Sequence, residues 1–209
     1  MRLGWIHVSP GCVVVDKPSG LLSVPGRGED KKDCAASRVQ ARFPEALVVH
    51  RLDMATSGLL VFARSQEMQR LLGDAFAARR VEKRYVAVLG GLVEADEQAI
   101  DLPLLTDWPN RPRQMVCHQR GKPSQTLLRV LERDSARQQT RVALLPLTGR
   151  SHQLRVHCLA IGHPILGDAL YAPPALQQAA PRLLLHAWQL GLPDMGEAPA
   201  LLLQSPPPF

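Results

Sequence analysis

Residues 50–63 read HRLDMATSGLLVFA and place charged and turn-forming residues between two apolar, β-branched segments. Residues 47–49 lead into this stretch and residues 59–63 lead out of it. Thr56, Ser57 and Gly58 are residue types that form turns. We therefore expect two strands of one sheet with Asp53 on the loop between them, and loops held by a rigid sheet often carry chemistry.

Two interpretations of Asp53 follow from this stretch. From residue chemistry alone, Asp53 is either a turn aspartate that bonds its own backbone or a partner of Arg51. The long contiguous motif, however, resembles the signature of the RluA family of RNA pseudouridine synthases. This resemblance implies that Asp53 is the catalytic nucleophile and that Arg51 enters the RNA stack when the target base leaves it.

Length and composition describe a folded, basic protein. The 209 residues, 45% of them hydrophobic, are enough for one large core or two small lobes. The net charge of +6 and an isoelectric point near 9.5 suggest a polyanionic partner. Aromatic residues make up only 4%, so any stacking on RNA bases must rest on one or two side chains.

The cysteines and the apolar segments exclude several classes of protein. Cys12, Cys34, Cys117 and Cys158 are scattered without a C-x-x-C pair, which indicates neither a zinc site nor a disulfide framework. They are typical of reduced thiols in a cytoplasmic protein. No segment approaches the ~18 apolar residues of a membrane span, and the N-terminus lacks a signal-peptide core.

The N-terminal part of the chain predicts a strand and a turn. Residues 12–15 are apolar, and residues 16–20 contain the proline and glycine of a turn, on which we expect Lys17 to be exposed. The sequence of residues 13–26, VVVDKPSGLLSVPG, resembles the opening motif of the family's catalytic domain. We expect a single catalytic domain over residues 1–209 without the S4 RNA-binding domain of many relatives, so the catalytic domain itself must recognise RNA.

Two helices are predicted in the first half of the chain. Asp33 can cap a helix of residues 34–42. Ser65 can cap a second helix whose apolar residues are spaced to form one buried face. Those residues are Met68, Leu71, Leu72, Ala75 and Phe76.

Residues 81–89 alternate between apolar and polar types, which predicts a strand with Tyr85 on the face of Ala87 and Leu89. An ordinary core tyrosine is one interpretation of Tyr85. The family's Lys-x-Tyr motif aligns with residues 83–85, and the resemblance implies that Tyr85 contacts the target base.

The second half of the chain predicts a long antiparallel hairpin, residues 126–132 and 140–147, followed by a helix that opens at GRSHQLRVH, residues 149–157. Arg155 is either a surface arginine or, as the resemblance implies, the partner of the catalytic aspartate. His152 and His157 are five residues apart, so they do not share a helical face as zinc ligands would. We interpret both as hydrogen-bonded structural residues.

Residues 182–187, RLLLHA, predict a buried strand that resembles the family's last motif, whose leucine forms an apolar wall near the nucleotide. Leu184 or Leu185 fits that role here, and we choose Leu185. Residues 101–114, DLPLLTDWPNRPRQ, combine an aromatic side chain with prolines and arginines, which is typical of a loop that contacts RNA.

We expect a mixed α+β fold, with a central, mainly antiparallel mixed sheet flanked by helices and loops. Moving the ribose bond of uracil from N1 to C5 needs no oxidation, hydrolysis or energy input, so we expect no cofactor and no metal. The chemistry needs a nucleophile, a counter-charge, a wall for the loose base and exclusion of water. An arginine beside a carboxylate favours the ionised form, and Asp53, Arg155, Tyr85 and Leu185 fit these roles.

The expected partner is structured RNA. Because the chain resembles the compact members of the family, the resemblance implies a tRNA anticodon stem-loop and a hairpin of 23S ribosomal RNA. We expect a cytoplasmic monomer without an obligate protein partner or membrane association. Two alternatives remain at this point: a basic RNA-binding module without chemistry, and a hydrolase of N-glycosidic bonds, although the motif offers no second carboxylate to activate water.

Overall fold

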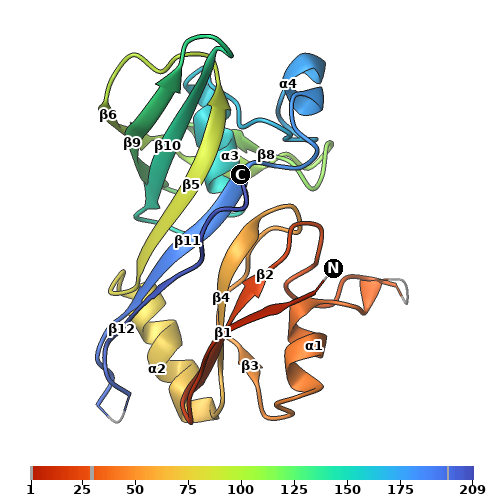
Figure 1. Cartoon of the computed structure of the whole chain (residues 1–209), viewed down its shortest axis with the longest axis vertical. Coiled ribbons are helices and arrows are strands. Elements are labelled where there is room, and N and C mark those ends of the chain that lie inside the picture. Colours follow the sequence, from red (N-terminus) through yellow and green to blue (C-terminus); the bar gives the residue numbers. More distant parts are fainter. Residues whose placement is uncertain (1, 29–30, 197) are drawn as a thin grey trace. The chain divides into compact units, whose positions relative to one another are not determined.

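The computed structural model describes residues 2–28, 31–196 and 198–209 (Figure 1). The chain divides into two compact units. The first comprises Met1–Lys83 with His186–Pro208, and the second comprises Arg84–Leu185 with Phe209. The first unit is therefore built from two separate segments of chain. The expectation of a single domain over residues 1–209 stays a prediction.

The first unit is built on a mixed sheet. Its strands are β1 (Gly4–Val8), β2 (Cys12–Lys17), β3 (Leu47–Val48), β4 (Ser57–Ala63), β11 (Leu185–Leu192) and β12 (Leu201–Gln204). β4 pairs antiparallel with β2 and β3 and parallel with β11, and β1 and β12 pair antiparallel with β2 and β11. β4 occupies an inner position, and every one of its residues is buried.

Helix α2 (Gln66–Ala77) packs against β3 and β4 and closes this core. The predicted apolar face is confirmed: Met68, Leu72 and Ala75 are buried among residues of β2, β4 and β11. Ser65 caps the helix as predicted, since its hydroxyl accepts from the Met68 N–H at 3.0 Å.

Helix α1 (Ala35–Gln40) begins one residue later than predicted, and its cap is different. Cys34 is the N-cap: its Sγ accepts from the Ser37 N–H at 3.3 Å, and the Ser37 hydroxyl accepts from the Cys34 N–H at 3.1 Å. Asp33 is not the cap because its carboxylate binds Arg38 instead, at 2.6 and 2.7 Å.

The second unit is built on antiparallel strands that lie side by side in the order β5, β10, β9, β6 (Figure 1). Their bounds are Glu82–Gly90 for β5, Gln139–Pro146 for β10, Gln125–Asp134 for β9 and Glu97–Asp101 for β6. The hairpin and the strand of Tyr85 are therefore confirmed. A short second hairpin, β7 (Leu104–Thr106) with β8 (Gln114–Val116), lies beside helix α3 (Gln153–Ala160), and α4 spans Pro174–Gln178.

The mixed α+β class with mostly antiparallel strands is thus confirmed. In the described part of the chain, no helix is both long enough and apolar enough to cross a membrane.

Candidate active site

The loop that carries Asp53 is fixed by hydrogen bonds on both sides of that residue. The Ser23 hydroxyl donates to the Leu52 carbonyl at 2.7 Å and accepts from the Leu52 N–H at 3.0 Å. The Thr56 N–H donates to the Asp53 carbonyl at 3.1 Å and closes a turn over residues 54–55. The main chain before and after Asp53 is therefore held in place, as a preorganised catalytic group requires.

Lys17 is fully buried and supports the same loop. Its Nζ donates to the carbonyls of Pro18 at 3.1 Å, Leu21 at 2.7 Å and Met54 at 3.1 Å. The prediction that Lys17 is exposed was wrong, because an ammonium with three N–H donors can be buried when backbone carbonyls accept them. Through Met54, Lys17 holds the residue that follows Asp53.

Two more hydrogen bonds join the turn after β2 to this loop. The Ser19 hydroxyl donates to the Ala55 carbonyl at 2.6 Å, and the Gly20 N–H donates to the Met54 carbonyl at 2.8 Å. Residues 17, 19 and 20 of the motif 13–26 therefore hold the Asp53 loop by donating hydrogen bonds to the main-chain carbonyls of Met54 and Ala55. The side chains at positions 54 and 55 take no part in these bonds.

Ser57 and Gly58 begin β4 and do not form the predicted turn, which lies at residues 54–55. Gly58 has φ +112°, and a Cβ added there would lie 2.6 Å from the backbone nitrogen of Ala187 in β11. Only glycine allows this approach in this conformation. The adjacent Ser57 hydroxyl bonds Nδ1 of His186 at 2.8 Å, which ties the strand after the loop to β11.

The side chains of Asp53 and Arg51 both reach the surface. Arg51 is exposed, and Asp53 is partly exposed between the buried residues Leu52 and Thr56. A large substrate can therefore approach the carboxylate and the guanidinium while the backbone between them stays fixed.

Arg155 is buried in the second unit and binds Asp168. The two side chains are 4% and 1% exposed, and Nε and Nη2 of Arg155 donate to the two carboxylate oxygens at 2.8 and 2.6 Å. The interpretation of Arg155 as a surface arginine is therefore wrong. This bidentate pair orients the Arg155 guanidinium, and its pairing with Asp53 stays a prediction.

Asp168, the partner of Arg155, was not among the residues that we predicted from the sequence. Its Oδ1 also accepts from the backbone N–H groups of Leu170 at 3.0 Å and Tyr171 at 3.2 Å. The only signal in the sequence was its position at the end of HPILGD, residues 163–168, a short distance after the motif of residues 149–157 that contains Arg155. A spacing of 13 residues through a loop gives no direct indication that the two charges pair.

Tyr171 is a second residue that the sequence missed. Its ring lies 5.0 Å from the Arg155 guanidinium carbon, and its hydroxyl accepts from the Gln114 N–H at 2.8 Å and bonds Nδ1 of His152 at 2.7 Å. His157 bonds Thr126 at 3.0 Å and the Leu102 carbonyl at 3.1 Å. Both histidines are hydrogen-bonded within the fold, as the sequence predicts.

Tyr85 lies in β5 opposite Leu144 and is partly exposed, whereas Ala87 and Leu89 on the same face are buried. Because Tyr85 is partly accessible, it differs from the buried core residues on that face. Its contact with a target base stays a prediction.

The two candidates for the apolar wall differ in exposure. Leu185 is 2% exposed, while Leu184 is partly exposed and is held by backbone bonds to Leu166 and Val88 at 3.0 and 3.1 Å. The choice of Leu185 over Leu184 stays a prediction. Asp53 and Arg51 belong to the first unit, and Tyr85, Arg155 and Leu185 belong to the second.

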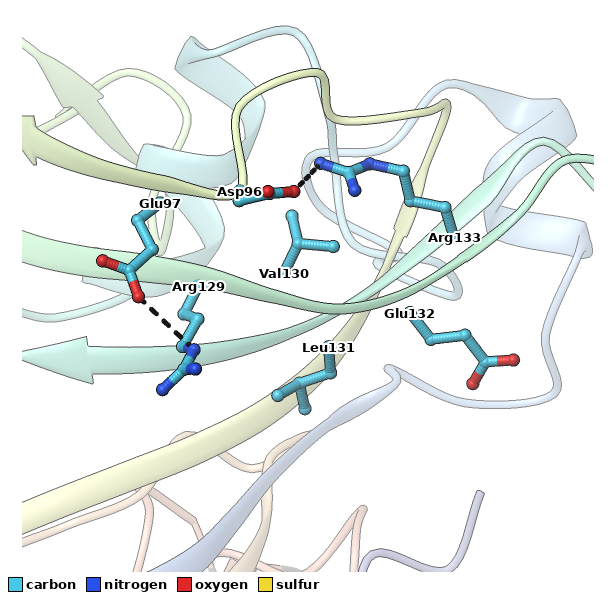
Figure 2. A pocket seen from close by; sticks show the side chains of 7 residues that line it. All are labelled: Asp96, Glu97, Arg129, Val130, Leu131, Glu132 and Arg133. Carbon is cyan, nitrogen blue, oxygen red and sulfur yellow. Dashed lines mark hydrogen bonds and ion pairs between the residues drawn. The ribbon is translucent and has the colours of Figure 1, made fainter.

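A hollow of ≈ 550 Å³ on the surface of the second unit contains none of these residues. Figure 2 shows its side chains, from Asp96 and Glu97 and from residues 129–133 of β9. Arg133 binds Asp96 at 2.7 Å and Arg129 lies 3.4 Å from Glu97. Because these arginines face carboxylates, the hollow offers little to an anionic substrate.

Among residues 2–28, 31–196 and 198–209, no group of three or more His, Cys, Asp or Glu side chains is placed to hold a metal ion. The cysteines described there are free thiols. Burial raises the pKa of Cys12 and strongly raises that of Cys158, so neither is a reactive thiolate.

The sequence matches known proteins over most of its length. The family model described as RNA pseudouridylate synthase matches residues 11–160. The dual-specificity RNA pseudouridine synthase RluA of Escherichia coli is 51% identical over 197 residues, which cover 94% of this chain and 90% of that protein. The proteins of the same name from Yersinia pestis and Pasteurella multocida are 54% and 48% identical, over 88% and 99% of this chain and 90% and 94% of theirs.

Solved structures agree with these matches. The human RNA Pseudouridylate Synthase Domain Containing 1 has a TM-score of 0.83 at 32% identity and covers all of this chain and 84% of its own. The human RNA Pseudouridylate Synthase Domain Containing 4 has a TM-score of 0.79 at 25% identity, and the match covers 98% of this chain and 88% of that one.

Proposed function

Because the chain belongs to the RNA pseudouridylate synthase family, we propose that it modifies two kinds of RNA with one catalytic aspartate, Asp53. It is an isomerase that converts uridine in RNA to pseudouridine. The proposed substrates are a tRNA anticodon stem-loop and a hairpin of 23S ribosomal RNA. The observation that supports this choice most strongly is the similarity to dual-specificity synthases along nearly the whole chain.

Asp53 is proposed as the group that reacts with the nucleotide. The isomerisation breaks the bond from C1′ to N1, turns the uracil and forms a bond from C1′ to C5, while the C5 hydrogen leaves as a proton. A carboxylate can attack the ribose C1′, attack the base C6 or remove a ribose proton, and each route needs one carboxylate in a fixed position. The bonds of Ser23, Thr56 and Lys17 to residues 52–54 supply that fixed position.

Arg155 is proposed as the counter-charge, with Tyr85 against the base and Leu185 as the apolar wall. Asp168 holds Arg155 by two hydrogen bonds, so the guanidinium is oriented before a substrate arrives. Asp168 also neutralises part of the charge, which makes burial of Arg155 tolerable.

Arg51 is proposed to fill the space that the target uridine leaves. A stacked uridine is covered by its neighbouring bases and cannot reach the Asp53 carboxylate, so it must leave the stack at a cost of a few kcal/mol, which is smaller in a single-stranded loop. Arg51 is exposed and two residues from Asp53, so its long side chain can enter the RNA while the uridine occupies the site. We propose that the enzyme works as a cytoplasmic monomer.

The test is release of tritium from RNA labelled at uridine C5, on an anticodon stem-loop and on a 23S hairpin. The native sequence should release tritium from both, and Asp53→Asn should release none while still binding RNA. Asp74→Asn, on the exposed face of α2, is the matched control and should keep full activity. Release from one RNA alone would contradict dual specificity, and release by Asp53→Asn would contradict the role of Asp53.

The two alternatives, a binding module and a hydrolase, predict different products. A binding module would release no tritium with any variant. A hydrolase would release free uracil from the same RNA, which chromatography of the reaction mixture detects.

A further inference from the structure

Trp108 is the most exposed of the large hydrophobic side chains that the structure describes as exposed, with 64% of its surface accessible. Tryptophan is highly buried on average in folded proteins. Trp108 lies in the loop of residues 107–113 that joins β7 to β8. An indole presented on the tip of a hairpin is therefore a feature that packing within the fold does not explain.

The loop that presents Trp108 is held by hydrogen bonds of its own. The Asp107 N–H donates to the Arg113 carbonyl at 3.0 Å, the Asn110 N–H donates to the Asp107 carbonyl at 3.1 Å, and the Arg113 N–H donates to the Asn110 carbonyl at 3.0 Å. The Asn110 side-chain amide also donates to the Asp107 carboxylate at 3.0 and 3.1 Å. Because the loop is already ordered, a ligand that binds Trp108 loses little free energy in ordering it.

Arg111 covers the indole from one side. Its guanidinium carbon lies 4.6 Å from the centre of the Trp108 ring, and its Nε donates to the Trp108 carbonyl at 3.1 Å. This arrangement places a positive charge beside an exposed aromatic surface. The pairing of an exposed ring with an arginine is what proteins use to stack a nucleobase and hold its phosphate.

The hairpin is attached to the cluster around Arg155. Arg113 lies 5.4 Å from the centre of the Tyr171 ring, and Gln114 of β8 donates its N–H to the Tyr171 hydroxyl at 2.8 Å. The same ring lies 5.0 Å from Arg155. Tyr171 therefore joins the base of the hairpin to the arginine that we propose for the active site.

We propose that Trp108 stacks against an unpaired base of the RNA substrate, a nucleotide near the target uridine, while Arg111 contacts its phosphate. The proposal rests on the proposed function and adds a binding site to it. A single-stranded nucleotide is the ligand that fits, because a base gives a flat face for the indole, and a phosphate gives the negative charge that a basic protein of net charge +6 attracts.

The direct test uses fluorescence of Trp108 alone. Trp5→Phe and Trp188→Phe leave Trp108 as the only indole in the chain, and Asp53→Asn prevents turnover. Addition of the anticodon stem-loop should quench the emission and saturate at the same RNA concentration as binding measured by filter retention. Binding without a change in the emission of Trp108 would overturn the proposal.

Kinetics give a second test with a matched control. Trp108→Ala should raise KM for the stem-loop by roughly five- to hundredfold, the range expected when one stacked base is lost, with kcat little changed. Trp108→Phe should restore most of the affinity, whereas Trp108→Leu should not. Trp5→Ala is the control, because Trp5 also has an arginine over its ring, Arg42 at 4.9 Å, but lies in β1 of the other unit.

The salt dependence of RNA binding distinguishes the contribution of the Trp108 ring from that of the Arg111 charge. Arg111→Gln should reduce the slope of log Kd against log salt by about 0.7, as loss of one phosphate contact to a single strand does, and Trp108→Ala should leave the slope unchanged. If the native sequence releases tritium and Trp108→Ala has an unchanged KM, the stacking site is contradicted. The proposed function is not affected by that result. Absence of tritium release by the native sequence overturns the proposed function, while the quenching experiment still reports on Trp108.

Discussion

At the scale of single residues, Lys17 shows how a buried charge supports the loop that carries Asp53. The ammonium is fully buried and donates to three carbonyls, one of them that of Met54. Hydrogen bonds to a charged group each contribute about 1.5–3 kcal/mol. Without the ammonium, three carbonyls of the turn and the loop would each lose a donor.

Lys17→Met is therefore expected to lower the free energy of unfolding by about 3 kcal/mol or more. Its kcat should fall as well, because the residue after Asp53 loses a support. Lys31→Met, a change at an exposed lysine of the same unit, should alter stability by no more than about 0.5 kcal/mol. Urea denaturation measures both variants, and equal stabilities would show that the bonds of Lys17 contribute nothing.

His50, next to Arg51, gives a prediction on pH. The Val61 N–H donates to Nε2 of His50 at 3.2 Å, and desolvation together with the charge of Lys83 lowers the pKa of His50 from 6.5 to about 3. Between these pH values the unfolded chain binds more protons than the folded one. Stability from this group is therefore present above pH 6.5 and is lost as the pH falls toward 3.

His50→Gln keeps an acceptor for Val61 but cannot take up this proton. The difference in unfolding free energy between the native sequence and His50→Gln should shrink as the pH falls from 6.5 to 4.5, by up to about 1.4 kcal/mol per pH unit. Urea denaturation at three pH values in this window measures it. A difference that stays constant with pH would mean that the ring titrates normally.

The residue scale also shows where sequence patterns fail. Average behaviour places a turn lysine in solvent, yet Lys17 is a core residue because the carbonyls around it happen to converge, and their positions depend on the folded chain. Asp168 and Tyr171 were missed for the same reason: their contacts to Arg155 arise only once helix α3 and the following loop are packed. The motifs containing Asp53, residues 50–63, and Arg155, residues 149–157, could be found because the residues of each motif are contiguous.

At the scale of elements, β4 determines where Asp53 lies. It pairs with β2 on one side and β11 on the other, and Gly58 near its start lets the backbone of Ala187 approach closely. A side chain at position 58 would have to push β11 away or change φ from +112°. Either change would disturb the strand that follows the loop of Asp53.

Gly58→Ala is expected to destabilise the protein by more than 1 kcal/mol, the strain from a positive φ being added to the overlap with Ala187. Gly73→Ala is the matched control, and its effect on stability should be opposite to that of Gly58→Ala. Nothing lies within 4 Å of a Cβ added at Gly73, which is inside α2, so the better helix former should stabilise by about 0.5–1 kcal/mol. Thermal unfolding of both variants checks the pair, and two changes of the same sign would contradict this account.

Elements with strong periodicity were predictable, and short ones were not. The apolar spacing in residues 68–76 predicted α2, and alternation predicted β5, β9 and β10. Strands β7 and β8 have three residues each, too few for any alternation to appear. Gly58 resembled a turn residue because glycine also serves where two backbones approach, and sequence alone does not separate these uses.

At the scale of the whole molecule, the first unit depends on chain from both ends of the sequence. Residues 186–204 supply most of β11 and all of β12, and Leu190 and Leu192 belong to the same buried core as Val14 and Val61. The second unit is formed mainly by the continuous segment Arg84–Leu185.

A chain shortened to residues 1–185 should therefore lose the folded first unit. Amides of β2 and β4 should exchange with solvent at unfolded rates, because β4 has lost its parallel neighbour and the core has lost two leucines. A chain shortened to residues 1–206 keeps both strands and should keep the protection. Hydrogen exchange measures both, and protected β4 amides in the shorter chain would contradict the dependence on β11.

The order in which the chain leaves the ribosome follows from this division. Residues up to 83 emerge before β11, and their sheet stays incomplete until β11 arrives about 100 residues later, roughly 5–20 s at the usual rate of synthesis. During that interval β4, whose residues are all buried in the finished protein, lacks a neighbour and is open to chaperones. The segment that carries Asp53 is thus translated well before the strand that completes its sheet.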